Sequence, residues 1–183
     1  MTPSRIPFPH ILVVTLVLLL LGSCHEADRT YCNLPAHFAM DNIYQAPVLY
    51  TACNSMGQFC TITPGNKTFI FASTTKTSVV NQTAMTNYTG FYLGLSGFIV
   101  GLPEIPELGR DESRVVCFDL ACANCYHEFG ITKRLELQEG GWAYCKSCER
   151  TYNLNDLGRT DKGRPLYRYR VSLVGNALII ANN

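Results

Sequence analysis

The chain has 183 residues and carries 15 Lys and Arg against 14 Asp and Glu, so its formal net charge is +1. Hydrophobic residues make up 47% of the chain and charged residues only 16%. This balance excludes a basic protein that binds nucleic acid by neutralising phosphates, and it excludes an acidic disordered chain. We therefore expect no nucleic-acid partner. The nine cysteines are an odd number, so at least one of them lies outside any set of internal disulfides.

The N-terminus is typical of an export signal. Arg5 precedes a largely apolar segment at 11–21, which is too short to cross a bilayer but has the length of a signal-peptide core. The Leu-Gly-Ser-Cys sequence that ends at Cys24 follows directly and resembles the bacterial lipobox, whose cysteine becomes acylated. We therefore predict a lipoprotein signal peptide at 1–23, with Cys24 as the lipid anchor. The alternative is an ordinary secretory signal that is cut near Ser23.

The predicted signal places the protein in the bacterial cell envelope, anchored to a membrane and facing the periplasm or the cell exterior. Three Asn-x-Ser/Thr sequons, at Asn66, Asn81 and Asn87, would also suit a glycosylated eukaryotic secreted protein. A loop rich in Asn and Thr produces such sequons by chance, and we favour that explanation. In either case the protein is exported to a compartment where thiols are normally oxidised or bound to metal.

The rest of the chain is long enough for one domain with a sizeable core. We expect residues 24–46 to form an N-terminal tether and residues 47–183 to form one all-β domain. Runs rich in β-branched and aromatic residues predict strands, and Gly-rich turns between them predict hairpins. The predicted strands lie at 47–50, 59–63, 68–72, 114–120, 134–138, 142–145, 166–173 and 177–181, with two more inside 91–103. Two polar stretches, 73–90 and 103–113, are predicted to be loops.

Two C-x-x-C motifs carry the chemistry of the sequence. They are Cys122-Ala-Asn-Cys125 and Cys145-Lys-Ser-Cys148, separated by 19 residues. Two thiolates at this spacing can approach one ion from a tight turn, and two such turns complete a tetrahedron. The spacing predicts a site made of Cys122, Cys125, Cys145 and Cys148. It leaves open a zinc ion, a single iron, an iron–sulfur cluster and, without metal, two disulfides.

The order of elements around these motifs resembles the Rieske domain. A strand leads into the first motif, and the second motif leads back into a strand, a Gly-rich turn, the Pro165-Leu166 step and a closing hairpin. The resemblance covers residues 115–181 and is weaker for 47–101. It implies an antiparallel β-sandwich with a small rubredoxin-like or zinc-ribbon-like metal-loop subdomain at about 117–157. The chain also resembles bacterial envelope lipoproteins with Rieske-like domains in which the metal ligands differ from the Rieske pattern.

The chain departs from the Rieske pattern at both histidine ligands. Cys122 and Cys145 match the two cysteine ligands, whereas the histidine positions fall on Asn124 and Cys148. A cluster with two histidine and two cysteine ligands therefore cannot form, and four thiolates would lower its potential. The N-terminus also lacks the Arg-Arg pair of the twin-arginine route, which carries folded, cofactor-loaded proteins. We therefore prefer zinc over a [2Fe–2S] cluster.

Two functions follow from the resemblance. The first is a membrane-anchored metal-binding module related to Rieske electron-transfer proteins, which could serve an unidentified redox partner in the envelope. The second is a non-redox structural or interaction lipoprotein stabilised by zinc or disulfides. The sequence contains no nucleophile elbow, phosphate loop or paired-carboxylate motif, so we propose no catalytic residue and, at most, an electron-transfer component.

Four cysteines remain outside the anchor and the predicted metal site. They are Cys32, Cys53, Cys60 and Cys117. Cys53 and Cys60 end a short Gly-containing segment and are candidates for a disulfide, while Cys117 lies in a predicted strand. The sequence does not decide how these four are paired.

Overall fold

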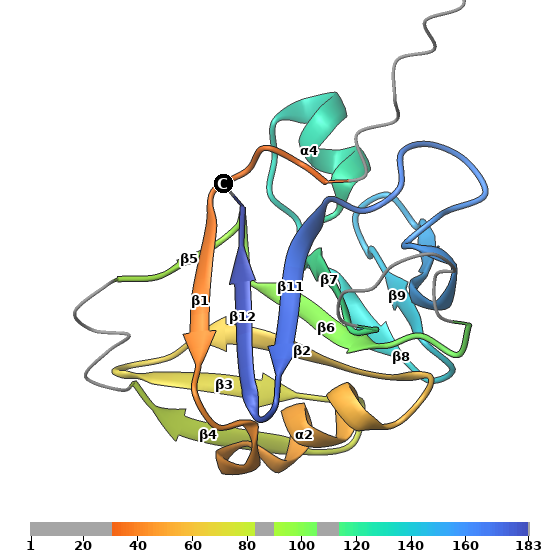
Figure 1. The fold of residues 1–183 in the computed structure, drawn as a ribbon. Coiled ribbons are helices and arrows are strands. Elements are labelled where there is room, and N and C mark those ends of the chain that lie inside the picture. The colour runs from red at the N-terminus through yellow and green to blue at the C-terminus, as the bar shows by residue number, and fades with distance from the viewer. Residues whose placement is uncertain (1–30, 83–89, 106–113, 183) are drawn as a thin grey trace, which may run out of the picture. The chain divides into compact units, whose positions relative to one another are not determined.

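The computed structural model describes residues 31–82, 90–105 and 114–182 (Figure 1). The predicted signal peptide at 1–23 and the predicted anchor Cys24 lie outside the described residues. Within the described part of the chain, no helix is long and apolar enough to cross a membrane.

A large antiparallel sheet dominates the described residues. Its strands follow the order β4-β3-β2-β6-β7-β11-β12-β1-β5. Every neighbouring pair in this order is antiparallel. The bounds are β1 Ala36–Met40, β2 Gln58–Pro64, β3 Thr68–Ala72, β4 Thr77–Asn81, β5 Tyr92–Leu93, β6 Phe98–Leu102, β7 Val116–Asp119, β11 Arg168–Val174 and β12 Ala177–Ala181. The mostly antiparallel β architecture predicted from the sequence is thus confirmed.

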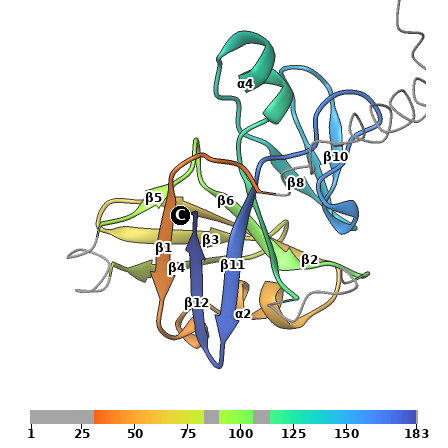
Figure 2. The ribbon, with the colours of Figure 1, turned by 45° about the horizontal axis from the view of Figure 1, so that its top comes forward.

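The sheet bends so that its two ends face each other. Figures 1 and 2 show β1, β12 and β11 crossing in front of β2, β3 and β4. The first hydrophobic core fills the space between these layers, with Phe38 of β1 and Phe69 and Phe71 of β3 among its buried residues. Phe38 packs edge-on against Phe69, with ring centroids 5.0 Å apart, which is a favourable aromatic geometry.

A second, smaller sheet packs on the other side of the middle strands. It consists of β8 Glu136–Gln138, β9 Trp142–Tyr144 and β10 Thr151–Asn153, and it is followed by the short helix η2 Leu154–Asp156. Alternate residues of β2, β6 and β7 face opposite sides, as strand geometry requires. Phe59, Ile99 and Phe118 therefore enter a second core under the small sheet. This double burial explains why β6 and β7 are buried at every position.

The structure differs from the sequence prediction at the start of the domain. Ala36–Met40, which lies inside the predicted tether, is strand β1 and pairs with both β12 and β5. The ordered domain therefore includes residues before 47. The predicted strand at 47–50 is instead the start of helix α2, Pro47–Asn54, because a proline suits the first turn of a helix and the apolar face packs on the core. A 3-10 turn, η1 Ile43–Gln45, precedes α2.

Two further elements were absent from the sequence prediction. Strand β4 lies within the stretch 73–90, which was predicted to be a loop, because it pairs with β3. Helix α4, Ala123–Phe129, follows Cys122 and ends at Gly130, whose φ of 66° is the left-handed conformation that commonly ends helices. The predicted strands at 59–63, 68–72 and 177–181 and both predicted hairpins are present, with small shifts at their ends.

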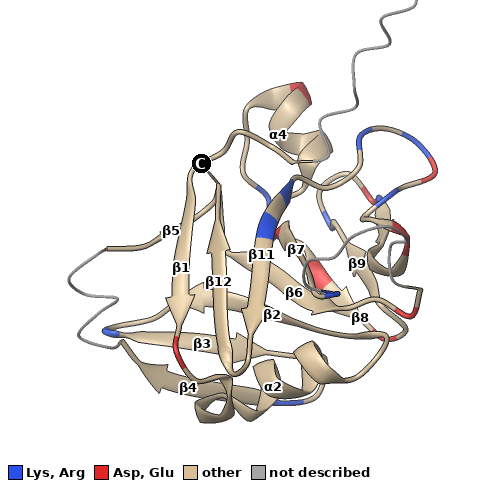
Figure 3. Cartoon of the chain, in the orientation of Figure 1, with Lys and Arg blue, Asp and Glu red and all other residues tan. Residues whose placement is uncertain are grey.

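A buried carboxylate joins several parts of the large sheet. Asp119, at the end of β7, is fully buried. It accepts hydrogen bonds from the backbone N–H of Leu95 at 2.8 Å, from that of Ala121 at 2.7 Å and from the Tyr169 hydroxyl at 2.6 Å. Burial raises the pKa of Asp119, and these donors oppose that rise. Charge is otherwise scarce on the large sheet: its described strands carry only Asp119, Arg168 and Arg170 (Figure 3).

Replacing Tyr169 by Phe tests how much this carboxylate stabilises the fold. The change removes a hydrogen bond to a buried charged group, so we expect the free energy of unfolding to fall by about 2 kcal/mol. Urea denaturation measures it. Tyr167→Phe is the matched control, since Tyr167 is only half-buried. Equal losses in the two variants would show that the Asp119 contact is unimportant.

Candidate metal centre

The structure brings the four predicted cysteines together. Their Sγ atoms all lie within 4.8 Å of one another. The Sγ atoms of Cys122 and Cys148 are 3.5 Å apart, and those of Cys125 and Cys145 are 3.8 Å apart. No other group of three or more potential ligands of this kind was found among the described residues. His127, which lies close by in the sequence, is exposed and is not part of the group.

Two local structures position these sulfur atoms. Cys122 is the N-cap of α4 and Cys125 lies in its first turn, so the first motif wraps around the start of a helix. The backbone N–H of Cys122 also donates to the carbonyl of Lys133, at 2.7 Å, which fixes the chain at both ends of α4. The second motif is the turn from β9 to β10. There the N–H of Glu149 donates to the Cys145 carbonyl, at 2.8 Å.

The four thiols differ in exposure and in acidity. Cys122, Cys125 and Cys145 are buried, whereas Cys148 is half-buried. Burial raises the pKa of Cys125 and that of Cys145. Burial also acts on Cys122, but hydrogen bonds from the Tyr152 hydroxyl and the Cys125 backbone N–H outweigh it and lower the pKa of this thiol. Among these three buried thiols, the pKa is lowered at Cys122 and raised at Cys125 and Cys145.

Tyr152 contacts the Cys122 sulfur, and Asn124 holds the Tyr152 hydroxyl in position. The Tyr152 oxygen lies 3.1 Å from Cys122 Sγ and accepts a hydrogen bond from Asn124 Nδ2 at 2.7 Å. Because that bond occupies the oxygen as an acceptor, the hydroxyl proton is free to point at the sulfur. Asn124 is held in turn by Arg164: its Oδ1 accepts from the Arg164 N–H at 3.0 Å, and its Nδ2 reaches the Arg164 carbonyl at 3.3 Å.

Asn124 therefore has a different task from the one its position in the motif implies. The predicted resemblance puts a histidine ligand at this position, whereas the structure buries Asn124 and bonds it to the Tyr152 hydroxyl. Cys125, one residue later, supplies a thiol instead. The sequence does not single out Tyr152, because a tyrosine in a short strand is an ordinary packing residue. Only the folded structure shows that its hydroxyl contacts Cys122.

The four cysteines outside this site that fall within the described residues are free thiols. Cys53, Cys60 and Cys117 are buried and Cys32 is half-buried, and none of them forms a disulfide. The proposed Cys53–Cys60 bond is thus not formed in this structure. Cys60 and Cys117 flank Val100 on adjacent strands, and burial raises the pKa of both thiols. They act here as small core residues.

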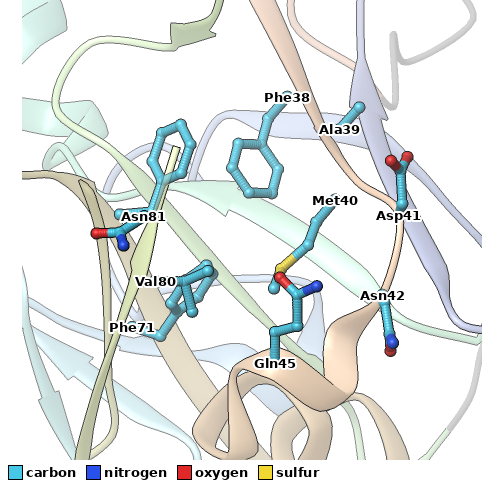
Figure 4. A pocket seen from close by; sticks show the side chains of 10 residues that line it. Phe38, Ala39, Met40, Asp41, Asn42, Gln45, Phe71, Val80 and Asn81 are labelled. Carbon is cyan, nitrogen blue, oxygen red and sulfur yellow. The ribbon is translucent and has the colours of Figure 1, made fainter. Parts of the chain in front are cut away.

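A small cavity lies in the first core, and no cysteine lines it (Figure 4). It measures about 50 Å³ and is bounded by Phe38, Met40 and Phe71, with the amides of Asn42 and Gln45 near its rim. A volume of this size holds a few water molecules and is well below that of ordinary ligand pockets. It therefore offers no binding site for a substrate.

Comparison of the chain with protein-family models, with curated proteins and with solved structures finds no match in any of the three. The resemblance to Rieske domains accordingly depends on the order of motifs and strands described above, and it stays a prediction.

Tyr152→Phe tests whether the hydroxyl stabilises the bound form of Cys122. Loss of a hydrogen bond to a metal ligand commonly weakens metal binding 10- to 100-fold, so we expect about a tenfold loss of zinc affinity here. Competition with a chromophoric chelator measures it. Tyr144→Phe removes a hydroxyl from the same small sheet and should leave the affinity unchanged. Equal affinities for the two variants would contradict a role for the Tyr152–Cys122 contact.

Proposed function

We propose that the protein is a lipid-anchored protein of the bacterial envelope whose Rieske-like domain holds one metal ion through Cys122, Cys125, Cys145 and Cys148. Zinc is preferred over a [2Fe–2S] cluster. The observation that supports the proposal is the convergence of four thiols within 4.8 Å of one another.

The spacing of the sulfur atoms suits a single ion. A tetrahedral zinc site has Zn–S bonds of about 2.3 Å, which places its sulfur atoms about 3.8 Å apart. The separations of 3.5 and 3.8 Å between the two closest pairs are near this value. In a two-iron cluster each iron holds its own pair of thiolates, so the two pairs are separated further by the distance between the irons. A single iron would fit as well as zinc, and metal analysis distinguishes them.

The proposed role of the ion is mainly structural. An isolated sheet of three short strands is weakly stable by itself. Bonds from one ion to α4 and to the β9–β10 turn would connect the two segments that cover the second core. Structural zinc sites contribute directly to folding free energy, because the ligand set does not exist in the unfolded chain.

Electron transfer is the second candidate function, and one observation favours it. Cys148 is the half-buried member of the set, so one of the four ligand residues is partly exposed on the side where a redox partner in the envelope could approach. This candidate requires iron at the site. The non-redox alternative, in which the domain serves structure or interaction, requires only zinc or another redox-inactive ion.

Metal analysis of the purified protein tests the proposal. We expect one zinc per chain, no visible absorption and no reversible potential in a redox titration. Replacing Cys122 or Cys145 by Ser should abolish zinc retention and lower the thermal midpoint, whereas Cys32→Ser, outside the cluster, should keep the metal. Two irons per chain with charge-transfer bands would support electron transfer and overturn the preference for zinc. Absence of any metal, with two disulfides found by mass spectrometry, would overturn the metal site itself.

The lipid anchor is tested separately. We expect the full-length chain expressed in a bacterial host to fractionate with membranes and to carry acyl groups on Cys24, as shown by mass spectrometry. Cys24→Ser should move the protein to the soluble fraction. Membrane association that survives this change, or an unmodified N-terminus cut elsewhere, would favour the ordinary secretory signal.

A further inference from the structure

A groove that has no part in the metal site lies between α2 and the β3–β4 hairpin, where Figure 1 shows α2 beside β4. Its volume is about 500 Å³, within the range of small-molecule sites. Its lining comes from α2, from the start of β2, from the β3–β4 turn that carries Lys76, and from Thr77 and Ser78 at the start of β4.

The turn that forms one wall is held firmly in place. The backbone N–H of Ser73 donates to the Lys76 carbonyl at 2.8 Å, and the Ser73 hydroxyl donates to the same carbonyl at 3.3 Å. The Ser73 oxygen also accepts from the N–H of Lys76 at 3.1 Å. The backbone that carries Lys76 is therefore ordered before any ligand binds, which reduces the entropic cost of binding.

The lining combines three kinds of group. Five side-chain hydroxyls and one amide supply hydrogen bonds, Lys76 supplies the only charge, and no acidic residue lines the groove. Pro47 at the start of α2 is exposed and gives the groove an apolar side, whereas Val48 and Ala52 beside it are buried in the first core. The Ser78 hydroxyl already accepts from the Val48 N–H at 3.3 Å, so its proton remains available. The Thr51 hydroxyl donates to the Pro47 carbonyl at 3.0 Å, so its oxygen remains an acceptor.

From this set of groups we infer that the groove binds an acidic sugar, either a free uronate or the terminal uronate of an oligosaccharide. A sugar hydroxyl both donates and accepts, which matches Ser78 as donor and Thr51 as acceptor. The single carboxylate pairs with the Lys76 ammonium in a charge-assisted hydrogen bond. The C–H face of the ring lies against the exposed Pro47 ring, and the volume accommodates one or two sugar units.

Nuclear magnetic resonance titration of the full mature chain tests the inference. D-glucuronate is the probe, with D-glucose and acetate as the neutral and the sugar-free comparison. We expect saturable shifts of the Val48, Lys76 and Ser78 amides with glucuronate, and at least tenfold weaker binding of glucose and of acetate. Lys76→Gln should weaken glucuronate binding about tenfold. Lys162→Gln, an exposed lysine outside the groove, should not.

Each other outcome overturns the inference. If acetate bound as tightly as glucuronate, the groove would be a general anion site. If glucose bound as tightly as glucuronate, the carboxylate would contribute nothing to recognition. Shifts outside the groove, no saturable shift, or equal effects of the two lysine variants would show that the groove does not bind the sugar. Sugar binding at this groove does not require the metal. The outcome therefore tests this inference independently of the proposed metal site.

Discussion

The carboxylate of Asp119 is the contact on which the arrangement of the two cores depends. It connects β7, which bears it, with β11 through Tyr169 and with the β5–β6 turn through Leu95. Its third bond, to the N–H of Ala121, sets the direction of the chain immediately before Cys122. A buried carboxylate is costly unless hydrogen bonds satisfy it, and here the donors come from segments far apart in the sequence. The same carboxylate thus holds Tyr169 of the first core and orients the chain that leads into the candidate metal centre.

The elements that the sequence predicted well are those whose signal is local. Strands β3 and β12 are short runs rich in aromatic, β-branched and aliphatic residues, which favour a strand by themselves. The Gly140–Gly141 turn likewise marks its hairpin through its own residues. The elements that it missed depend on distant partners. The short strand β1 falls in the segment predicted to be a tether. It pairs with β12 at the other end of the chain, and the sequence around β1 carries no signal of that pairing. The first residues of α2 are as apolar as a strand, and only packing against the core decides for helix.

The candidate site shows the same division. The four cysteines could be grouped from spacing alone, because each C-x-x-C turn is a local structure. The groups that surround them could not, since Tyr152, Asn124 and Arg164 meet only after the small sheet and the loop before β11 have folded. Asn124 is instructive in this respect. Its position in the motif suggested a lost ligand, whereas its contacts give it the task of orienting a hydroxyl toward Cys122.

The place of β1 in the sheet also shortens the segment that would connect a lipid on Cys24 to the domain. The N–H of Cys32 is already bonded to the Arg168 carbonyl, so the folded part begins there rather than after residue 46. With acylation at Cys24, only eight residues would join lipid to fold, a reach of about 28 Å at full extension. A linker of this length would keep the start of the domain close to the bilayer surface.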